Sequence, residues 1–177
     1  MKLRRLHHQQ SGFSVIELLI YITIFSTMIG AVVGLAVLAS GQKVNSQATA
    51  DINYQGEATM ALITQTIHQA TAITAPTPAT NSASLTLSMP NTAVNPTVFS
   101  TYNDGTTTRF RISEGSPAVT NNLTNSHVTV SNLTFTNMSL PSTKGSVLIA
   151  FTITYRTGSA RQEFSVSKRF MGAATIP

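Results

Sequence analysis

The N-terminal part of the chain contains a long, uninterrupted run of apolar residues. The run extends from Phe13 to Leu38, holds 26 residues and carries one charge, the carboxylate of Glu17. A helix of that length is roughly 39 Å long, which exceeds the roughly 30 Å hydrocarbon core of a bilayer. The pattern therefore predicts a membrane-spanning helix over residues 13–39, with a carboxylate near its start.

The position of Glu17 inside this apolar run needs an explanation. A carboxylate within a spanning helix costs roughly 2.5–3.5 kcal/mol on insertion scales, so it is retained mainly where it has a function. The alternative is that Glu17 lies at the level of the lipid headgroups and is solvated. The uninterrupted helix, its face of small residues and the Gly12–Phe13 junction before it favour a function.

Small residues recur along one face of the apolar run. Ser26, Gly30 and Gly34 are spaced four residues apart, which places them on the same side of a helix. Small side chains let a second helix approach closely, so we expect a helix-packing face here. The alternative is the general surplus of glycine in membrane helices.

Helical periodicity continues beyond the apolar run, although the composition changes. From Ser40 to Ile73, apolar and small residues recur at steps of three and four, which gives an amphipathic stripe. The stripe consists of Val44, Ala48, Ile52, Thr59, Leu62, Ile63, Thr66, Ile67 and Ala70. Since no proline precedes Pro76, the pattern predicts one long helix. Its second part, residues 40–75, is expected to pack on the chain's own globular region.

The remainder of the chain has the alternation that is typical of β-strands. After a polar linker at residues 76–83, residues 84–177 are expected to form an antiparallel β-sheet region. The predicted fold class is therefore α+β, with the long N-terminal helix packed on the sheet. Asn103-Asp104-Gly105 predicts a hairpin turn, and the break in alternation at Ser131-Asn132 predicts a β-bulge. The expected strands are 84–89, 97–102, 107–113, 127–138, 147–155 and 161–171.

The leader that precedes the apolar run, residues 1–12, is basic. It contains Lys2, Arg4 and Arg5. Positive residues beside a spanning helix tend to stay in the cytoplasm, so we expect the C-terminal region outside the cytoplasm. An ordinary secretory signal has an apolar core of about 7–15 residues, which is much shorter than this run.

Composition and charge narrow the function classes further. The formal net charge is +5, but without the leader the remaining eight basic residues outnumber the six acidic ones by only two. The basic isoelectric point is thus weak support for nucleic-acid binding. The chain has no cysteine, which excludes a disulfide, a thiolate metal site and a cysteine nucleophile.

The stretch Gly12-Phe13-Ser14-Val15-Ile16-Glu17-Leu18 resembles the class III signal of type IV pilins and type II secretion pseudopilins. That signal combines a short basic leader, a glycine before the cleaved bond, a phenylalanine after it and a glutamate at the fifth mature residue. This sequence has Ser14 where threonine is commoner. It also lacks the mid-span proline and the cysteines that many of these pilins have. The strand-rich C-terminal region looks more like a minor pilin or pseudopilin than a major one.

The resemblance implies a mechanism and a set of partners. A prepilin peptidase would cut between Gly12 and Phe13, and the new amine of Phe13 would be N-methylated. The subunit would wait in the cytoplasmic membrane as a single-pass protein among membrane lipid. An inner-membrane assembly platform would then move its helix into a type IV pilus or pseudopilus of other pilin subunits. Glu17 would set the assembly register by pairing with the Phe13 amine of a neighbouring subunit.

A membrane-anchored surface adhesin that does not polymerise is the main alternative. Nucleic-acid contact through Arg109 and Arg111 on one strand face is a further hypothesis, which competes with scattered solvated charges that protect sheet edges. Catalysis is not expected, and neither is a metal or other cofactor. The candidate residues lack metal-ligand or triad spacing: His68, His127, Asp51, Glu57, Asp104, Glu114 and Glu163.

Overall fold

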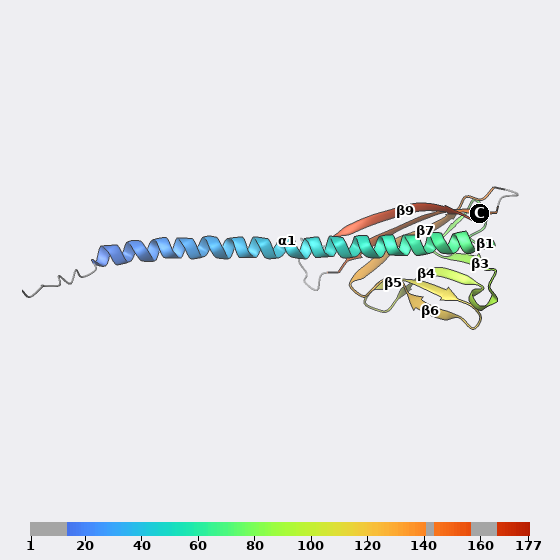
Figure 1. The fold of residues 1–177 in the computed structure, drawn as a ribbon, viewed down its shortest axis with the longest axis horizontal. Helices are drawn as coiled ribbons and strands as arrows, with labels where there is room; N and C mark the ends of the chain where they lie inside the picture. The colour runs from blue at the N-terminus through green and yellow to red at the C-terminus, as the bar shows by residue number, and fades with distance from the viewer. Residues whose placement is uncertain (1–13, 141–143, 157–165) are drawn as a thin grey trace, which may run out of the picture. The chain divides into compact units, whose positions relative to one another are not determined.

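The computed structural model describes residues 14–140, 144–156 and 166–177. Helix α1 extends from Val15 to Gln69 (Figure 1). The strands after it are β1 (Ala72–Ala75), β2 (Asn81–Ser82), β3 (Leu85–Ser88), β4 (Thr97–Asn103), β5 (Thr108–Glu114), β6 (Val119–Asn122), β7 (Val128–Asn137), β8 (Ser146–Tyr155) and β9 (Ser167–Thr175). A short 3-10 helix, η1 (Thr92–Val94), lies between β3 and β4. The α+β fold class that the sequence predicts is confirmed.

The chain divides into two units, residues 1–43 and residues 44–177. The described part of the first unit is the apolar beginning of α1. Each of its side chains from Ser14 to Ser40 is exposed. A helix that is apolar on all sides lacks the polar face by which a surface helix meets water.

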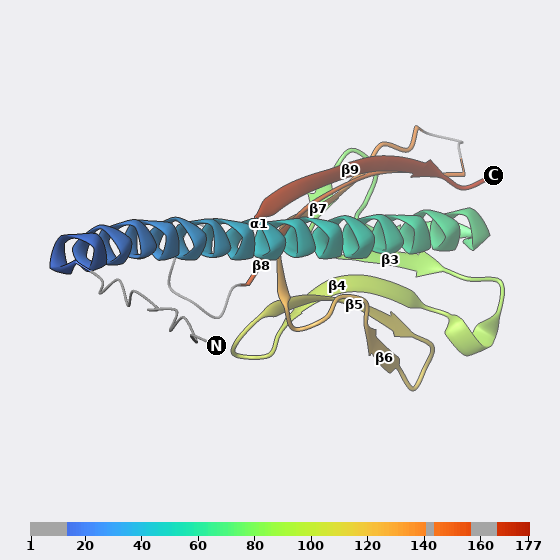
Figure 2. The same cartoon turned by 60° about the vertical axis from the view of Figure 1, so that its left-hand side comes forward.

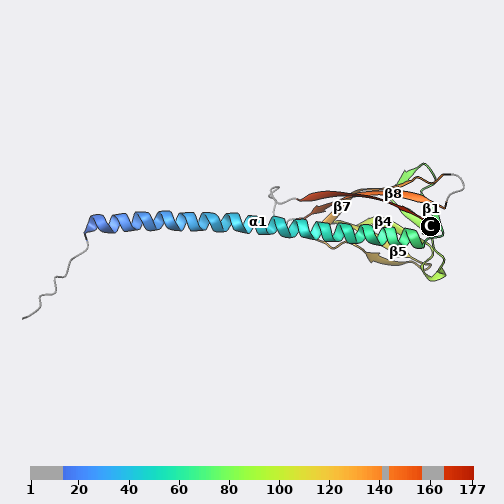
Figure 3. The ribbon, with the colours of Figure 1, turned by 45° about the horizontal axis from the view of Figure 1, so that its top comes forward.

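The strands of the second unit form two antiparallel sheets. One sheet has the order β1-β3-β4-β5-β6, and the other has the order β2-β7-β8-β9. The two groups of strands lie on either side of the second part of α1, as Figures 2 and 3 show from two directions. The sequence pattern predicts strands but does not divide them between sheets, so the second sheet is a finding of the structure.

An aromatic cluster joins the two sheets in the core. The ring of Phe110, on β5, makes edge contacts with three other rings. Their centroids lie 6.3 Å away for Phe99, 6.4 Å for Phe135 and 5.6 Å for Phe151. Phe99 belongs to the same sheet as Phe110, whereas Phe135 and Phe151 belong to the other. All four side chains are fully buried, and edge contacts of this kind add about 0.5–1.5 kcal/mol each beyond area burial.

The stripe on the second part of α1 is the face that packs on the sheets. Its buried members are Ala48, Ile52, Thr59, Ile63, Thr66, Ile67 and Ala70. Leu62, which the sequence pattern also allowed in the stripe, is exposed because the helical position next to Ile63 points away from the sheets. The side chain of Val44 lies outside the described part of the structure.

Helix α1 ends earlier than the sequence pattern predicts. The expected boundary was Ala75, but the helix stops at Gln69 and residues 72–75 form β1. The reason is a competing partner: the N–H and the hydroxyl of Thr71 both donate to the carbonyl of Ser88, at 2.8 Å and 3.0 Å. The segment after Thr71 then pairs with β3. The expected linker, residues 76–83, likewise contains β2, and the polar strand β6 was not anticipated.

Two local predictions are confirmed. Strands β4 and β5 form the hairpin around Asn103-Asp104-Gly105, and Gly105 adopts the left-handed φ of +90° that this turn requires. The pairing of β7 with β8 shifts register between Ser131 and Thr134, and Asn132 has φ +52°. This is the bulge that the broken alternation predicts. Of the expected strand 161–171, residues 161–165 lie outside the described residues, and β9 extends beyond its expected end to Thr175.

Candidate functional site

The first candidate site is the beginning of α1. Glu17 lies in its first turn, where a carboxylate stabilises the positive end of the helix dipole, and its side chain is exposed. Gly12 and Phe13, the predicted cleavage and methylation residues, lie outside the described residues. The structure thus shows a helix that begins at Val15, two residues after Phe13, and carries a single acidic residue in its first turn.

The face formed by Ser26, Gly30 and Gly34 is open. All three residues are exposed, and a Cβ added at Gly30 or Gly34 would meet no heavy atom within 4 Å. No described part of this chain packs there. The large apolar side chains around these small residues are exposed as well, among them Ile29 at 48% and Leu38 at 66%. This helix is long and apolar enough to cross a membrane once.

The side chains of Arg109 and Arg111 both contact other residues of the sheet region. Nη2 of Arg109 lies 2.7 Å from Oδ2 of Asp104, and the guanidinium of Arg111 lies 3.7 Å from the centroid of the Tyr102 ring. Both arginines are half-buried on β5. An ion pair and a ring contact account for these two cations, so their grouping does not by itself indicate a nucleic-acid interface.

Asp104 organises the turn that these arginines follow. Its Oδ1 accepts hydrogen bonds from the backbone N–H of Thr107 at 2.7 Å and of Thr106 at 3.0 Å, and from the Thr106 hydroxyl at 2.8 Å. These donors hold the pKa of the Asp104 carboxyl well below its usual range, with the N–H of Thr107 contributing most. Oδ2 of the same carboxylate pairs with Arg109, so both carboxylate oxygens are engaged within this hairpin.

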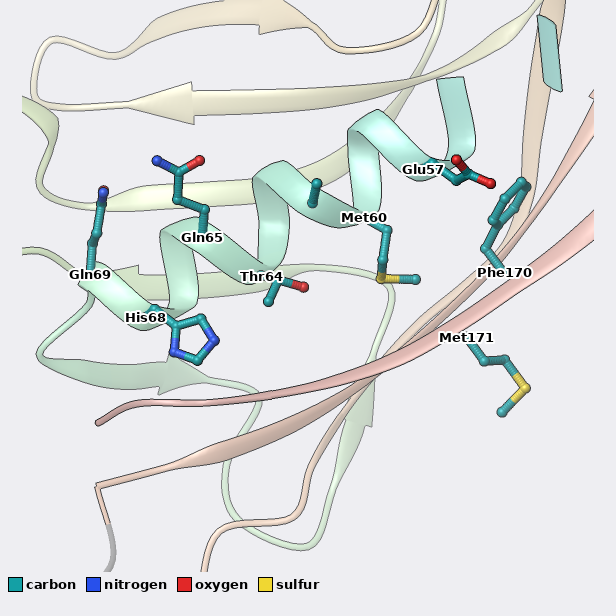
Figure 4. Close-up of a pocket in the computed structure, with 9 residues that line it drawn as sticks. Glu57, Met60, Thr64, Gln65, His68, Gln69, Phe170 and Met171 are labelled. Atoms are coloured by element: carbon teal, nitrogen blue, oxygen red, sulfur yellow. The ribbon is translucent and has the colours of Figure 1, made fainter. Parts of the chain in front are cut away.

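A groove runs along the outer flank of α1 beside β9. Its volume is about 790 Å³. Figure 4 shows Met60 and Thr64 of the helix along it, with Glu57 near one end and His68 near the other. The full lining is Glu57, Met60, Ala61, Thr64, Gln65, His68, Gln69, Phe170 and Met171. Met60, Ala61 and Thr64 of the helix give the groove an adaptable and mostly apolar wall.

The other titratable residues are dispersed. Within the described ranges, no three of the histidine, aspartate and glutamate side chains converge on a point where a metal ion could bind. His68 is exposed in the last turn of α1, where a cation is favoured by the helix dipole, and His127 is exposed before β7.

Two residues that position α1 were missed by the sequence analysis. Gln55 is buried; its Nε2 donates to Asp51 at 3.0 Å, and its Oε1 accepts from the N–H of Asn125 at 2.9 Å. Gly56 is buried against the ring of Phe170. A polar residue and a glycine break the apolar stripe, so the periodicity gives no sign of either contact.

Comparison with known proteins gives no match to this chain: no family model, no curated protein and no solved structure matches it.

Proposed function

We propose that this chain is a structural, minor pilin-like subunit. A prepilin peptidase processes it after Gly12, and it assembles through its N-terminal helix into a type IV pilus or pseudopilus. The observation that carries the proposal is the division of one helix into two kinds of surface. From residue 48 onward its apolar face is covered by the chain's own sheets, whereas the part from Ser14 to Ser40 is exposed on every side.

The exposed part must be covered by something outside this chain. Burial of a leucine, isoleucine or phenylalanine side chain is worth about 1.5–3 kcal/mol, and this segment exposes more than a dozen large apolar side chains. Lipid tails can cover them in a waiting state, and the helices of other subunits can cover them in a filament. The open face of Ser26, Gly30 and Gly34 suits the second partner, because it admits another helix at close range.

Glu17 gives the assembly its register in this proposal. Cleavage after Gly12 creates an ammonium group on Phe13, one helical turn before the carboxylate of Glu17. Both groups are costly in an apolar environment unless they are paired. When the helix enters a bundle, Glu17 of one subunit meets Phe13 of its neighbour, and a subunit in the wrong register leaves both charges unpaired.

Partners and location follow from the same proposal. The peptidase, an inner-membrane assembly platform and other pilin subunits act on the helix, and the basic leader keeps its N-terminus in the cytoplasm. Residues 44–177, which we call the sheet domain, then lie outside the cytoplasm. After assembly they lie on the filament surface.

The test is the N-terminus of the protein in sheared filaments. The chain is expressed with a prepilin peptidase and an assembly system, and filaments are separated from cells. We expect this chain in the filament fraction, beginning at an N-methylated Phe13 by mass spectrometry. Recovery only in membranes, with residues 1–12 retained, would overturn the proposal and favour the non-polymerising surface adhesin.

A further inference from the structure

The free edges of the two sheets differ sharply in length. Each sheet has two outer strands, and three of the four are short: β1 and β6 have 4 residues each, and β2 has 2. β9 has 9 residues. Proteins commonly blunt sheet edges with short strands, charges or proline, because an open edge is a template for another strand. The edge of β9 lacks the first of these protections.

The backbone of β9 presents unpaired hydrogen-bonding groups along this edge. In an antiparallel pair, alternate residues direct their N–H and C=O groups toward the partner strand. The N–H of Tyr155 donates to the carbonyl of Val166, and the N–H of Ile176 donates to that of Gly145, so even-numbered residues of β9 face β8. The odd-numbered residues direct their groups outward: Ser167, Arg169, Met171, Ala173 and Thr175. No other described residue hydrogen-bonds to the backbone of these five.

The side chains along the second half of β9 offer little protection against a new strand. Lys168 and Arg169 stand at its beginning, but Phe170 to Thr175 contains neither charge nor proline. The apolar groove described above borders this same stretch, since Phe170 and Met171 line it together with Ala61 and Thr64 of α1. The open backbone edge of β9 and the apolar groove thus lie side by side (Figure 4).

We propose that the free edge of β9 is a strand-acceptor site, which binds an extended segment of another polypeptide as an added β-strand. A strand is the occupant that the backbone specifies, because only an extended chain can pair with groups repeated at every second residue. A helix would leave these N–H and C=O groups without partners and gain only the groove.

The groove specifies the side chains of this segment. Alternate residues of an added strand project to the α1 side of the sheet. There they meet the small side chains of Ala61 and Thr64 on the flank of the helix. Medium-sized apolar residues such as valine or isoleucine fit that flank. The carboxylate of Glu57 near one end of the groove suits a cationic residue at the corresponding end of the segment. This site lies in the sheet domain and does not depend on whether the helix assembles into a filament.

The test uses the full chain in detergent micelles and a capped peptide of sequence Lys-Val-Thr-Val-Thr-Val-Lys. Amide hydrogen exchange of the five outward residues is measured by NMR with and without peptide. We expect exchange at Met171 and Ala173 to slow about tenfold when the peptide is at about ten times its Kd. The amides of Phe170 and Gly172 already pair with β8 and should change much less. Absence of slowing up to about 5 mM peptide, or equal slowing of both sets, would overturn the proposal.

A proline variant separates strand addition from binding in the groove alone. Ala173→Pro removes an outward N–H but no bond to β8, so the domain should stay folded while peptide binding is lost. Ala173→Thr, which keeps the N–H, should still bind. If the proline variant does not fold, two N-methylated peptides decide the matter, one methylated at the valine amides and the other at the threonine amides. One of the two should lose binding; equal binding, or equal loss, contradicts the site.

Discussion

The ring of Phe170 lies directly over the backbone of Gly56, which is where β9 meets α1. A Cβ at position 56 would be only 2.1 Å from Cζ of that ring. Phe170 in turn stacks on Phe151, with centroids 5.4 Å apart and planes inclined by 20°. A similar contact follows along the strand, since a Cβ at Gly172 would be 2.9 Å from Sδ of Met60. Helix and strand interlock because each has a glycine opposite the other's large side chain.

This contact predicts that Gly56→Ala destabilises the sheet domain. An added methyl forces Phe170 off its stack, and overpacking of this kind costs about 1–3 kcal/mol. The higher helix propensity of alanine stabilises the helix by about 1 kcal/mol. Because the overpacking cost is larger over most of its range, we expect a net loss of stability. We expect the midpoint of thermal unfolding, followed by near-ultraviolet circular dichroism of the tyrosines, to fall by a few degrees.

The chain offers a matched control for this substitution. Gly34→Ala adds the same methyl to the same helix where nothing lies within 4 Å, so the sheet domain should unfold at the wild-type temperature. The double variant Gly56→Ala, Phe170→Leu should recover part of the loss, because the smaller side chain leaves room for the methyl. An unchanged or higher midpoint for Gly56→Ala alone would contradict the packing argument.

The sequence predicts those parts of the fold that depend on local pattern. The apolar run, the stripe of Ile52, Ile63 and Ile67, the Asp104-Gly105 turn and the bulge near Asn132 each leave a signature within a few residues. They were correctly placed because periodicity and turn chemistry act over that same range. The α+β class follows from these elements alone.

Features that depend on distant partners could not be predicted in this way. The end of α1 is set by a bond between Thr71 and Ser88, and the residues after Gln69 are equally compatible with a helix or a strand until that partner is known. The polar strand β6 forms because β5 lies beside it. The groove exists only where β9 passes the flank of α1, so no stretch of sequence marks it.

Asp104 should give the domain a pH-dependent stability. Its pKa is lowered in the folded chain by the N–H groups of Thr107 and Thr106, so the folded state holds fewer protons than the unfolded state in acid. The contribution is complete above the unfolded pKa of about 4, and it is lost as pH falls below that value. We expect Asp104→Asn to unfold at a lower temperature than wild type at pH 7, and the difference to shrink below about pH 4. A constant difference from pH 7 to pH 2 would refute this account.

The predicted cleavage point can be tested by substitution at Gly12. A peptidase must approach the backbone closely at the bond it cuts, and a branched side chain there obstructs it. We expect Gly12→Val to keep its first twelve residues in cells that contain a prepilin peptidase, as intact-mass measurement of the membrane fraction would show. Ser14→Thr is the control, because it introduces the residue commoner in such signals and should be shortened normally. A shortened Gly12→Val protein would place the cleavage elsewhere.

Glu17 should be required for assembly but not for processing. If Glu17 pairs with the Phe13 ammonium of a neighbour as proposed, Glu17→Ala leaves that ammonium unpaired in the helical bundle, which costs roughly 3–5 kcal/mol. We expect a normally shortened protein in the membrane and at least about a tenfold loss from sheared filaments, since about 1.4 kcal/mol already corresponds to tenfold. Glu17→Gln keeps the shape of the side chain without its charge and should fail in the same way. Normal filament content of Glu17→Gln would show that shape rather than charge sets the register, and normal content of both variants would remove Glu17 from the assembly mechanism.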